Sequence, residues 1–138
     1  MPPPNELTDR IRRKIVESGL DTRYNVGAYE FVMGGLDFCT TKIGEKRHVT
    51  GQELSKALLM LAHRQFGPMA KSVLNRWGVK TTDDFGSIVY NMIRVGILDK
   101  RPEDSLDDFN DVIDIDALFN VIEYFQIDKE YIRQLKGV

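Results

Sequence analysis

Apolar positions between residues 50 and 98 recur at three- and four-residue steps, a spacing that predicts amphipathic helices. Glycines interrupt the pattern twice, so we expect three consecutive helices, over residues 51–66, 68–77 and 82–95. Thr50 is the expected N-cap of the first helix, and Glu53 stands where it completes a capping box. Two helices joined by a short turn that contains glycine are typical of a helix-turn-helix.

The segment after the third predicted helix decides between two architectures. Residues 96–98 lead into a polar turn, and residues 112–115 contain the β-branched side chains that favour a returning strand. With a small β-hairpin between residues 97 and 115, residues 50–115 would form a winged-helix-like core. A compact helical bundle also uses short helices and glycine turns, so both alternatives stay open.

Three more helices are expected, over residues 6–18, 25–43 and 116–125. The predicted fold class is therefore mainly α, a compact helical domain. The second of these helices contains Gly27, Gly34 and Gly35, each of which weakens a helix by up to about 1 kcal/mol relative to alanine. Either another helix packs closely against the bare backbone, or the helix kinks near Gly34 and Gly35.

The chain has the size and composition of one soluble domain. Its 138 residues are 42% hydrophobic and 29% charged, which is enough for a core and lacks the bias of a disordered protein. We expect a single domain over residues 1–138, of which the Pro-rich residues 1–5 are disordered. Cys39 is the only cysteine and no signal peptide is recognised, so the cytoplasm is the expected compartment. No membrane partner and no internal repeat are expected.

Charge is distributed unevenly along the chain. Residues 1–80 carry 13 Lys/Arg and 8 Asp/Glu, a net charge of +5, whereas residues 81–138 carry 6 and 13, a net charge of −7. Unless the fold interleaves the halves, the molecule is a charge dipole, which favours self-association or pairing with a charged protein partner. The interaction candidates belong to the third helix and the acidic hairpin: Asn91, Arg94, Asp104, Asp107, Asp108 and Asp111.

The helix-turn-helix spacing makes nucleic-acid binding an alternative. Asn91 and Arg94 are expected on the exposed face of the third helix, where they could contact bases. Asp83 and Asp84 occupy the leading end of that helix, where phosphate binding needs cations, and they disfavour DNA recognition. Basic candidates for a nucleic-acid surface elsewhere are Arg10, Arg12, Arg13, Lys14, Lys46 and Arg47.

Catalytic and metal-binding patterns are weak. His48 and His63 are the only histidines and do not have zinc-ligand spacing, and no nucleophile motif or phosphate-binding glycine loop is present. Cys39 falls within a helical pattern and is expected in the core. An enzyme with a pocket around His48 and Glu53 is the least supported alternative. No catalytic residue, metal or cofactor is predicted.

Several short segments carry a resemblance to a known family. They are Arg23-Tyr24, Ala28–Val32, His48–Leu54, Gln65–Gly67, Trp77–Val79, Asp84–Gly86, Glu103–Ser105 and Asp108-Phe109. From about Ile11 to Phe119, the chain resembles an uncharacterised family of small bacterial proteins from planctomycetes, verrucomicrobia and their relatives. The family has no established activity, so the resemblance implies only a bacterial, cytoplasmic protein. The positions that it marks for mutation are Arg23, Tyr24, His48, Glu53, Trp77, Asp84 and Asp108.

Two main functional hypotheses follow from the sequence. The first is a non-catalytic interaction module whose third helix and acidic hairpin contact a protein partner, another copy of the chain included. The second is a nucleic-acid-associated regulator of the helix-turn-helix type that uses the basic N-terminal helix.

Overall fold

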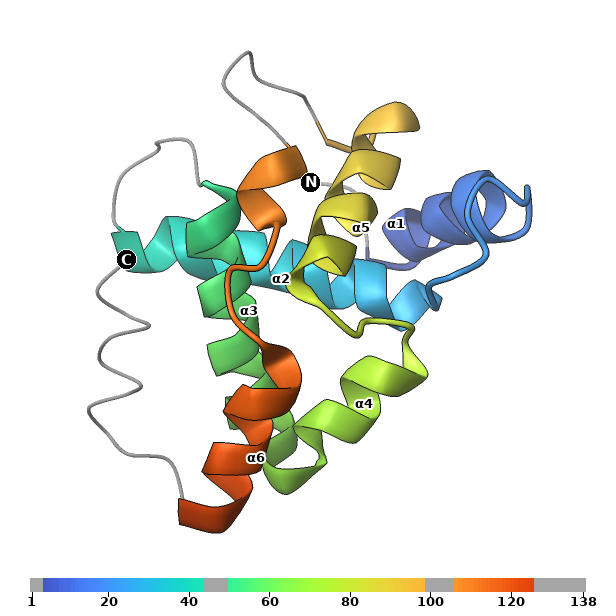
Figure 1. The fold of residues 1–138 in the computed structure, drawn as a ribbon. Coiled ribbons are helices and arrows are strands. Elements are labelled where there is room, and N and C mark those ends of the chain that lie inside the picture. The colour runs from blue at the N-terminus through green and yellow to red at the C-terminus, as the bar shows by residue number, and fades with distance from the viewer. Residues whose placement is uncertain (1–3, 44–49, 99–105, 126–138) are drawn as a thin grey trace.

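A computed structural model describes residues 4–43, 50–98 and 106–125, and all regular secondary structure in these ranges is helical (Figure 1). The α-helices are α1 (Pro4–Ile11), α2 (Val26–Ile43), α3 (Gly51–Phe66), α4 (Ala70–Arg76), α5 (Thr82–Arg94) and α6 (Ile115–Phe125). Short helices of other types are the π-helix η1 (Arg12–Val16) and the 3₁₀-helices η2 (Gly67–Met69) and η3 (Leu106–Phe109). The mainly α fold class is confirmed.

The helix α2 runs across the molecule, and α3 and α5 both pack across it (Figure 1). The largest fully buried side chains come mostly from these three helices: Tyr29, Val32, Leu58, Leu59, Phe85, Ile88 and Met92. Ile11 and Ile15 are fully buried as well, so the N-terminal helix covers one edge of this core. The helix α4 packs against both α3 and α6. No helix within the described ranges is long and apolar enough to cross a lipid bilayer.

The predicted helix boundaries agree with the structure to within two residues. Thr50 caps α3 as expected, because its Oγ1 accepts a hydrogen bond from Glu53 N (3.1 Å) and its own N–H donates to Glu53 Oε1 (3.3 Å). The first predicted helix changes type within its length. Glu17 N donates to Arg12 O across five residues, so the chain widens from α1 into the π-turn of η1.

The predicted wing hairpin is wrong in the part of it that the structure describes. The helices η3 and α6 occupy that segment, no strand is present among the described residues, and residues 99–105 lie outside them. The cause is a set of bonds to α5: Thr82 Oγ1 donates to Phe109 O (2.7 Å) and accepts from Val112 N (3.1 Å). Backbone groups that a hairpin would pair are thus used by a side chain. The winged-helix architecture is not supported, and the alternative of a compact helical domain fits the described residues.

Close packing, and not a kink, accounts for Gly35 in α2. The helix continues without interruption from Val26 to Ile43. A Cβ on Gly35 would lie 2.3 Å from Leu58 Cδ2 and 3.7 Å from Leu54 Cδ1, so only a bare backbone lets α3 approach this closely. For this glycine, the first of the two predicted alternatives is confirmed.

Candidate functional site

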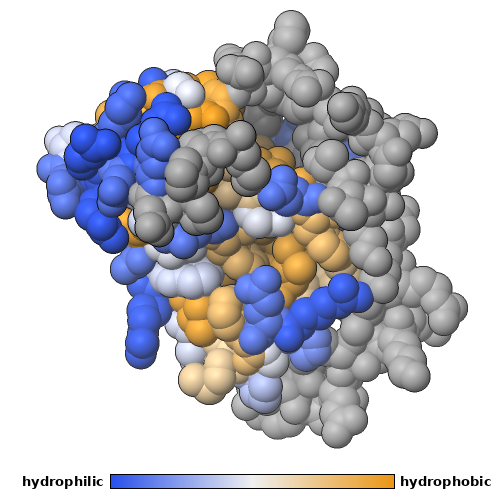
Figure 2. Space-filling view, turned by 180° about the vertical axis from the view of Figure 1, so that it is seen from behind, coloured by the Kyte–Doolittle hydropathy of each residue, from blue (hydrophilic) through white to orange (hydrophobic). Residues whose placement is uncertain are grey.

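A groove of about 590 Å³ follows α2 and is bounded by the C-terminal half of α3 and by Trp77. It is lined by Gly27, Glu30, Phe31, Gly34, Asp37, Phe38, Leu61, Gln65 and Trp77. Its volume falls within the range of roughly 300–1,000 Å³ that is typical of ligand sites. The view from behind shows an apolar area in the middle of the molecule, bordered by hydrophilic side chains (Figure 2).

A five-residue motif that occurs twice in α2 builds one side of this groove. Residues 27–31 (Gly-Ala-Tyr-Glu-Phe) and residues 34–38 (Gly-Gly-Leu-Asp-Phe) share a glycine, an acidic residue and a phenylalanine at the same spacing. A shift of seven residues is almost two complete turns, so equivalent residues of the two motifs lie on the same side of the helix. Each motif contributes a glycine, a carboxylate and an aromatic ring to the lining of the groove.

Trp77 covers the glycine of the first motif. A Cβ on Gly27 would lie 2.6 Å from Trp77 Nε1 and 2.9 Å from Trp77 Cε2, so the indole rests directly on the helix backbone. The indole also packs against the rings of Phe31 (5.5 Å between centroids) and Phe66 (5.6 Å, edge to face). Aromatic pairs at these distances attract each other beyond the effect of burying their area. This end of the groove is therefore a preformed aromatic wall.

The glycine of the second motif is open. Apart from the adjacent residues and the helix's own backbone, no atom of the described residues lies within 4 Å of the position that a Cβ on Gly34 would occupy. Phe38 flanks this position from the next turn of α2, and Leu61 and Gln65 line the groove from α3. We call the open space over Gly34 the Gly34 notch, and Phe38, Leu61 and Gln65 line the groove of which it is part.

Two carboxylates, those of Glu30 and Asp37, give the groove a negative rim. Both residues are exposed, and within the part of the chain that the structure describes neither has an ion-pair or hydrogen-bond partner. They are seven residues apart, which is about 10.5 Å along the helix axis. The groove thus offers apolar contacts at its floor and, at its edge, two negative charges that no described residue pairs.

A separate polar cluster holds the loop before α2 against α5. The carboxylate of Asp21 accepts hydrogen bonds from Arg23 Nε (3.0 Å) and Nη2 (2.8 Å), and also from Asn91 Nδ2 (2.8 Å). Asn91 Nδ2 donates to Tyr29 Oη as well (3.1 Å). The hydrogen bonds from Arg23 hold the pKa of Asp21 well below its usual range, so this carboxylate stays charged at neutral pH.

Tyr24 and Asp84 form a second connection between this loop and α5. Tyr24 Oη donates to Asp84 Oδ1 (2.5 Å), while Asp84 Oδ2 accepts from Lys80 N (2.8 Å) and Thr81 N (3.1 Å) at the start of the helix. Burial, together with the bond to Asp84, raises the pKa of Tyr24. Asp84 therefore caps α5 and anchors the loop, and its oxygens are already occupied.

The structure brings together Arg23, Tyr24, Asp84, Asn91 and Arg94, which the sequence singled out for different reasons. The prediction that Asn91 lies on an exposed recognition face is wrong, because Asn91 is only 3% exposed and links α5 to Asp21. Arg94 is exposed, with its Cζ 5.6 Å from the centroid of the Tyr90 ring. The residues of this cluster mainly fix the loop in place.

Of the acidic interaction candidates, the three that the structure describes do not project from the molecule as a wing. Asp107 is exposed in η3, but Asp108 packs against α3, since a Cβ on Gly51 would lie 2.8 Å from Asp108 Cβ. Asp111 N donates to Asp83 Oδ1 (3.2 Å) at the start of α5. This acidic segment therefore packs along the N-terminal ends of α3 and α5.

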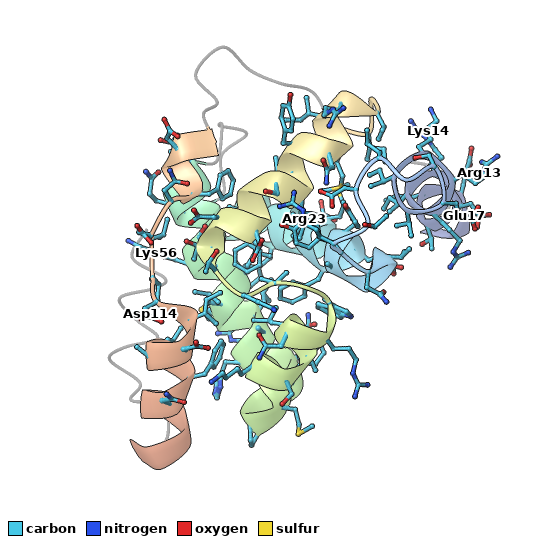
Figure 3. All side chains as sticks on the ribbon, turned by 45° about the vertical axis from the view of Figure 1, so that its right-hand side comes forward. Arg13, Lys14, Glu17, Arg23, Lys56 and Asp114 are labelled. Atoms are coloured by element: carbon cyan, nitrogen blue, oxygen red, sulfur yellow. The ribbon has the colours of Figure 1, made fainter. Side chains whose placement is uncertain are left out.

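The basic candidates of the N-terminal helix lie at one end of the molecule. Arg12, Arg13 and Lys14 are exposed on η1, and Arg10 is half-buried on α1. Figure 3 shows Arg13 and Lys14 on the opposite side of the molecule from Asp114. The described part of the chain thus keeps its basic N-terminal helix apart from the start of α6.

Within the described residues, the candidates for catalysis or metal binding do not form a site. Cys39 is 5% exposed, and burial raises the pKa of its thiol to about 11, which suits the core position predicted for it. His63 is half-buried, and burial lowers its pKa. Among the described residues, no group of three or more His, Cys, Asp or Glu side chains could hold a metal ion. Several sequence candidates lie outside the described residues, namely Lys46, Arg47, His48 and Asp104.

No protein-family model, no curated protein and no solved structure matches this chain. Inference about function therefore depends on the geometry of the groove and of the surfaces around it.

The groove was not predicted from the sequence, although a signal for it was present. The expectation of no internal repeat overlooked the two motifs at residues 27–31 and 34–38, whose central residues differ in size and polarity. Trp77 was expected as a core anchor, and it is only partly buried because one side of its indole borders the groove. The spacing of the apolar residues showed that α2 has an apolar side. It did not show which of the glycines in α2 are covered by a side chain from another part of the fold.

Proposed function

We propose that this chain is a non-catalytic protein-interaction module that binds an amphipathic helix of a partner protein along the groove on α2. The observation that carries the proposal is the combination of an apolar groove of about 590 Å³ with two exposed carboxylates on its rim that have no partner among the described residues. Apolar grooves recognise amphipathic helices through side chains spaced three, four and seven residues apart. The surface proposed here replaces the third helix and acidic hairpin that the sequence favoured.

Charge complementarity defines the chemistry of the partner. Glu30 and Asp37 are about 10.5 Å apart along α2, which is also the separation of residues i and i+7 on a second helix. A partner helix with apolar residues on one stripe and Lys or Arg beside them can bury the stripe and pair both carboxylates. Electrostatic complementarity of this kind raises the association rate and selects against acidic helices.

The experiment uses Trp77, the only tryptophan of the chain, as a reporter inside the groove. The probe is a synthetic helical peptide made of leucine and lysine, with lysines seven residues apart. We expect a saturable change in Trp77 fluorescence, and at least tenfold weaker binding when glutamate replaces lysine in the peptide. Gly34→Leu should abolish the change, because the new side chain fills the groove.

A matched control is Ser72→Leu, which adds the same side chain to an exposed position of α4 outside the groove. This variant should bind the peptide like the unmodified protein. The proposal fails if the unmodified protein shows no saturable change, or if Gly34→Leu and Ser72→Leu bind the peptide equally well. Sizing of the free protein over a wide concentration range tests whether a second copy is the partner.

A second candidate function is association with nucleic acid through η1. It is favoured by three consecutive exposed cations, Arg12, Arg13 and Lys14, at one end of the molecule (Figure 3). Binding to single-stranded RNA or random duplex DNA should then weaken steeply with salt, because each neutralised phosphate releases counterions. The candidate is discarded if no binding occurs at about 50 mM salt, where phosphate contacts are strong.

A further inference from the structure

The two motifs of α2 differ in what covers their glycines. The indole of Trp77 lies on Gly27, within 3 Å of the point where a Cβ would be, whereas the same point at Gly34 is open for 4 Å around. A phenylalanine follows each glycine by four residues, Phe31 in the first motif and Phe38 in the second. Among the described residues, a side chain of the protein itself thus covers the first glycine and none covers the second. The Phe38 ring of the second motif is not bare, because Arg64 Cζ lies 5.9 Å from its centroid.

The occupied half indicates what kind of side chain the empty half fits. Over Gly27 the indole lies directly on the backbone and 5.5 Å, centroid to centroid, from the ring of Phe31. A bare helix backbone beside an aromatic ring favours another flat ring, because the ring makes many contacts with the backbone and an edge or face contact with its neighbour. Phe38, whose ring centroid lies 5.9 Å from Arg64 Cζ, is the ring nearest in sequence to the Gly34 notch, and Leu61 is an apolar residue of α3 that lines the same groove.

We propose that the Gly34 notch receives an aromatic side chain of the partner helix, bound to the second motif as Trp77 is bound to the first. This proposal rests on the proposed function, and it identifies the anchor residue of the partner. The carboxylate of Asp37, which has no partner among the described residues, lines the same groove, so the aromatic residue is accompanied by a Lys or Arg within one turn of the partner helix. The occupant is therefore an amphipathic helix with an aromatic anchor beside a cation.

The first test uses free indole as the probe and does not require any partner. We expect indole to shift the backbone amide NMR signals of Gly34, Phe38 and Leu61 in a saturable way. Gly34→Leu should weaken this binding at least tenfold, since the leucine occupies the notch, while Ser72→Leu should leave it unchanged. The proposal is overturned if indole shifts none of these signals, or if Gly34→Leu binds indole as well as Ser72→Leu does.

The second test compares two leucine–lysine peptides that differ at one central position, phenylalanine in one and alanine in the other. Burying a phenylalanine side chain is worth about 1.5–3 kcal/mol, so the phenylalanine peptide should bind at least tenfold more tightly. In Gly34→Leu this preference should disappear. Equal affinity of the two peptides for the unmodified protein contradicts the aromatic anchor but leaves the groove as a helix site. If indole binds at Gly34 and neither peptide binds, the helix-binding function fails and the aromatic notch stands.

Discussion

Gly34 and Gly35 are neighbours in the sequence, yet their surroundings are opposite. A Cβ on Gly35 would lie 2.3 Å from Leu58 Cδ2, whereas no side chain from another described element lies within 4 Å of the equivalent point on Gly34. One step along an α-helix rotates the side-chain direction by about 100°, which is enough to pass from the closed side of α2, packed on α3, to the open side that forms the groove. Glycine therefore lets α3 pack closely at position 35, whereas at position 34 it leaves part of the surface of α2 uncovered.

The residues around the two glycines differ in the same way. Along the closed side, Ala28, Val32, Gly35 and Cys39 follow at steps of three and four and are all buried. The open side combines two exposed carboxylates with Phe38, which is only partly buried, and with Phe31, which is 8% exposed. We therefore expect substitutions on the closed side to change the free energy of unfolding, and substitutions on the open side to change binding.

The largest effect is expected for Leu58→Ala, on the closed side. Leu58 is fully buried against Gly35, so the truncation removes apolar contacts and leaves a cavity, at a cost of about 2–5 kcal/mol in the free energy of unfolding. Leu61→Ala is the matched substitution on the groove side of the same helix, where the side chain is half-buried, and should cost less than half as much. Urea denaturation of both variants checks the difference, and equal costs would contradict the distinction between the two sides.

Asp21→Asn tests the polar cluster that reaches the closed side through Asn91 and Tyr29. Loss of the charge weakens the bonds from Arg23 and should destabilise the protein by about 1–3 kcal/mol at neutral pH. Because folding lowers the pKa of Asp21, its contribution is complete above the ordinary aspartate pKa of about 3.9 and is lost as the pH falls below that value.

Urea denaturation at neutral pH and at about pH 2.5 measures this contribution directly. The unmodified protein should be more stable than Asp21→Asn at neutral pH, and the gap should narrow in acid. Asp37→Asn on the open side is the control, since Asp37 has no partner in the described structure and its loss should leave stability nearly unchanged. A gap that is independent of pH would show that the charge of Asp21 is not what stabilises the loop.

Gly35→Ala should also lower the free energy of unfolding, but by less than the two preceding substitutions. The added methyl group gains up to about 1 kcal/mol in helix propensity, but it collides with Leu58, and overpacking of this kind costs about 1–3 kcal/mol. Leu58 is itself fully buried and cannot move into solvent, so a net loss of about 1–2 kcal/mol is expected. Thermal unfolding beside the unmodified protein measures it, and unchanged stability would mean that α2 and α3 separate easily.

Local signals explain why the helices could be predicted and the groove could not. The Thr50 and Glu53 capping box and the glycines at positions 67 and 78 act on adjacent backbone, so they appear directly in the sequence. The failed hairpin depends on Thr82, which is 27 residues away from Phe109 in the chain and takes the carbonyl that a strand would have used. Burial of Asn91 likewise depends on its distant partners Asp21 and Tyr29. The groove exists because α3 covers Gly35 and not Gly34, a difference that only tertiary packing sets.

Gly34→Ala is the mildest substitution and separates the two sides most clearly, because it should raise stability and weaken binding together. The helix gains up to about 1 kcal/mol, since alanine replaces glycine without meeting any neighbour, and thermal unfolding should shift upward by about 3 °C. The methyl group also lifts an aromatic ring away from the backbone, so indole and the phenylalanine peptide should bind several-fold more weakly. Stability measured by thermal unfolding and affinity measured by NMR would then change in opposite directions, which no substitution on the closed side should produce.

If Gly34→Ala gains stability and keeps full affinity, the bare backbone is not part of the binding surface. If it loses stability, the open side is covered in solution, and the contrast with Gly35 does not hold.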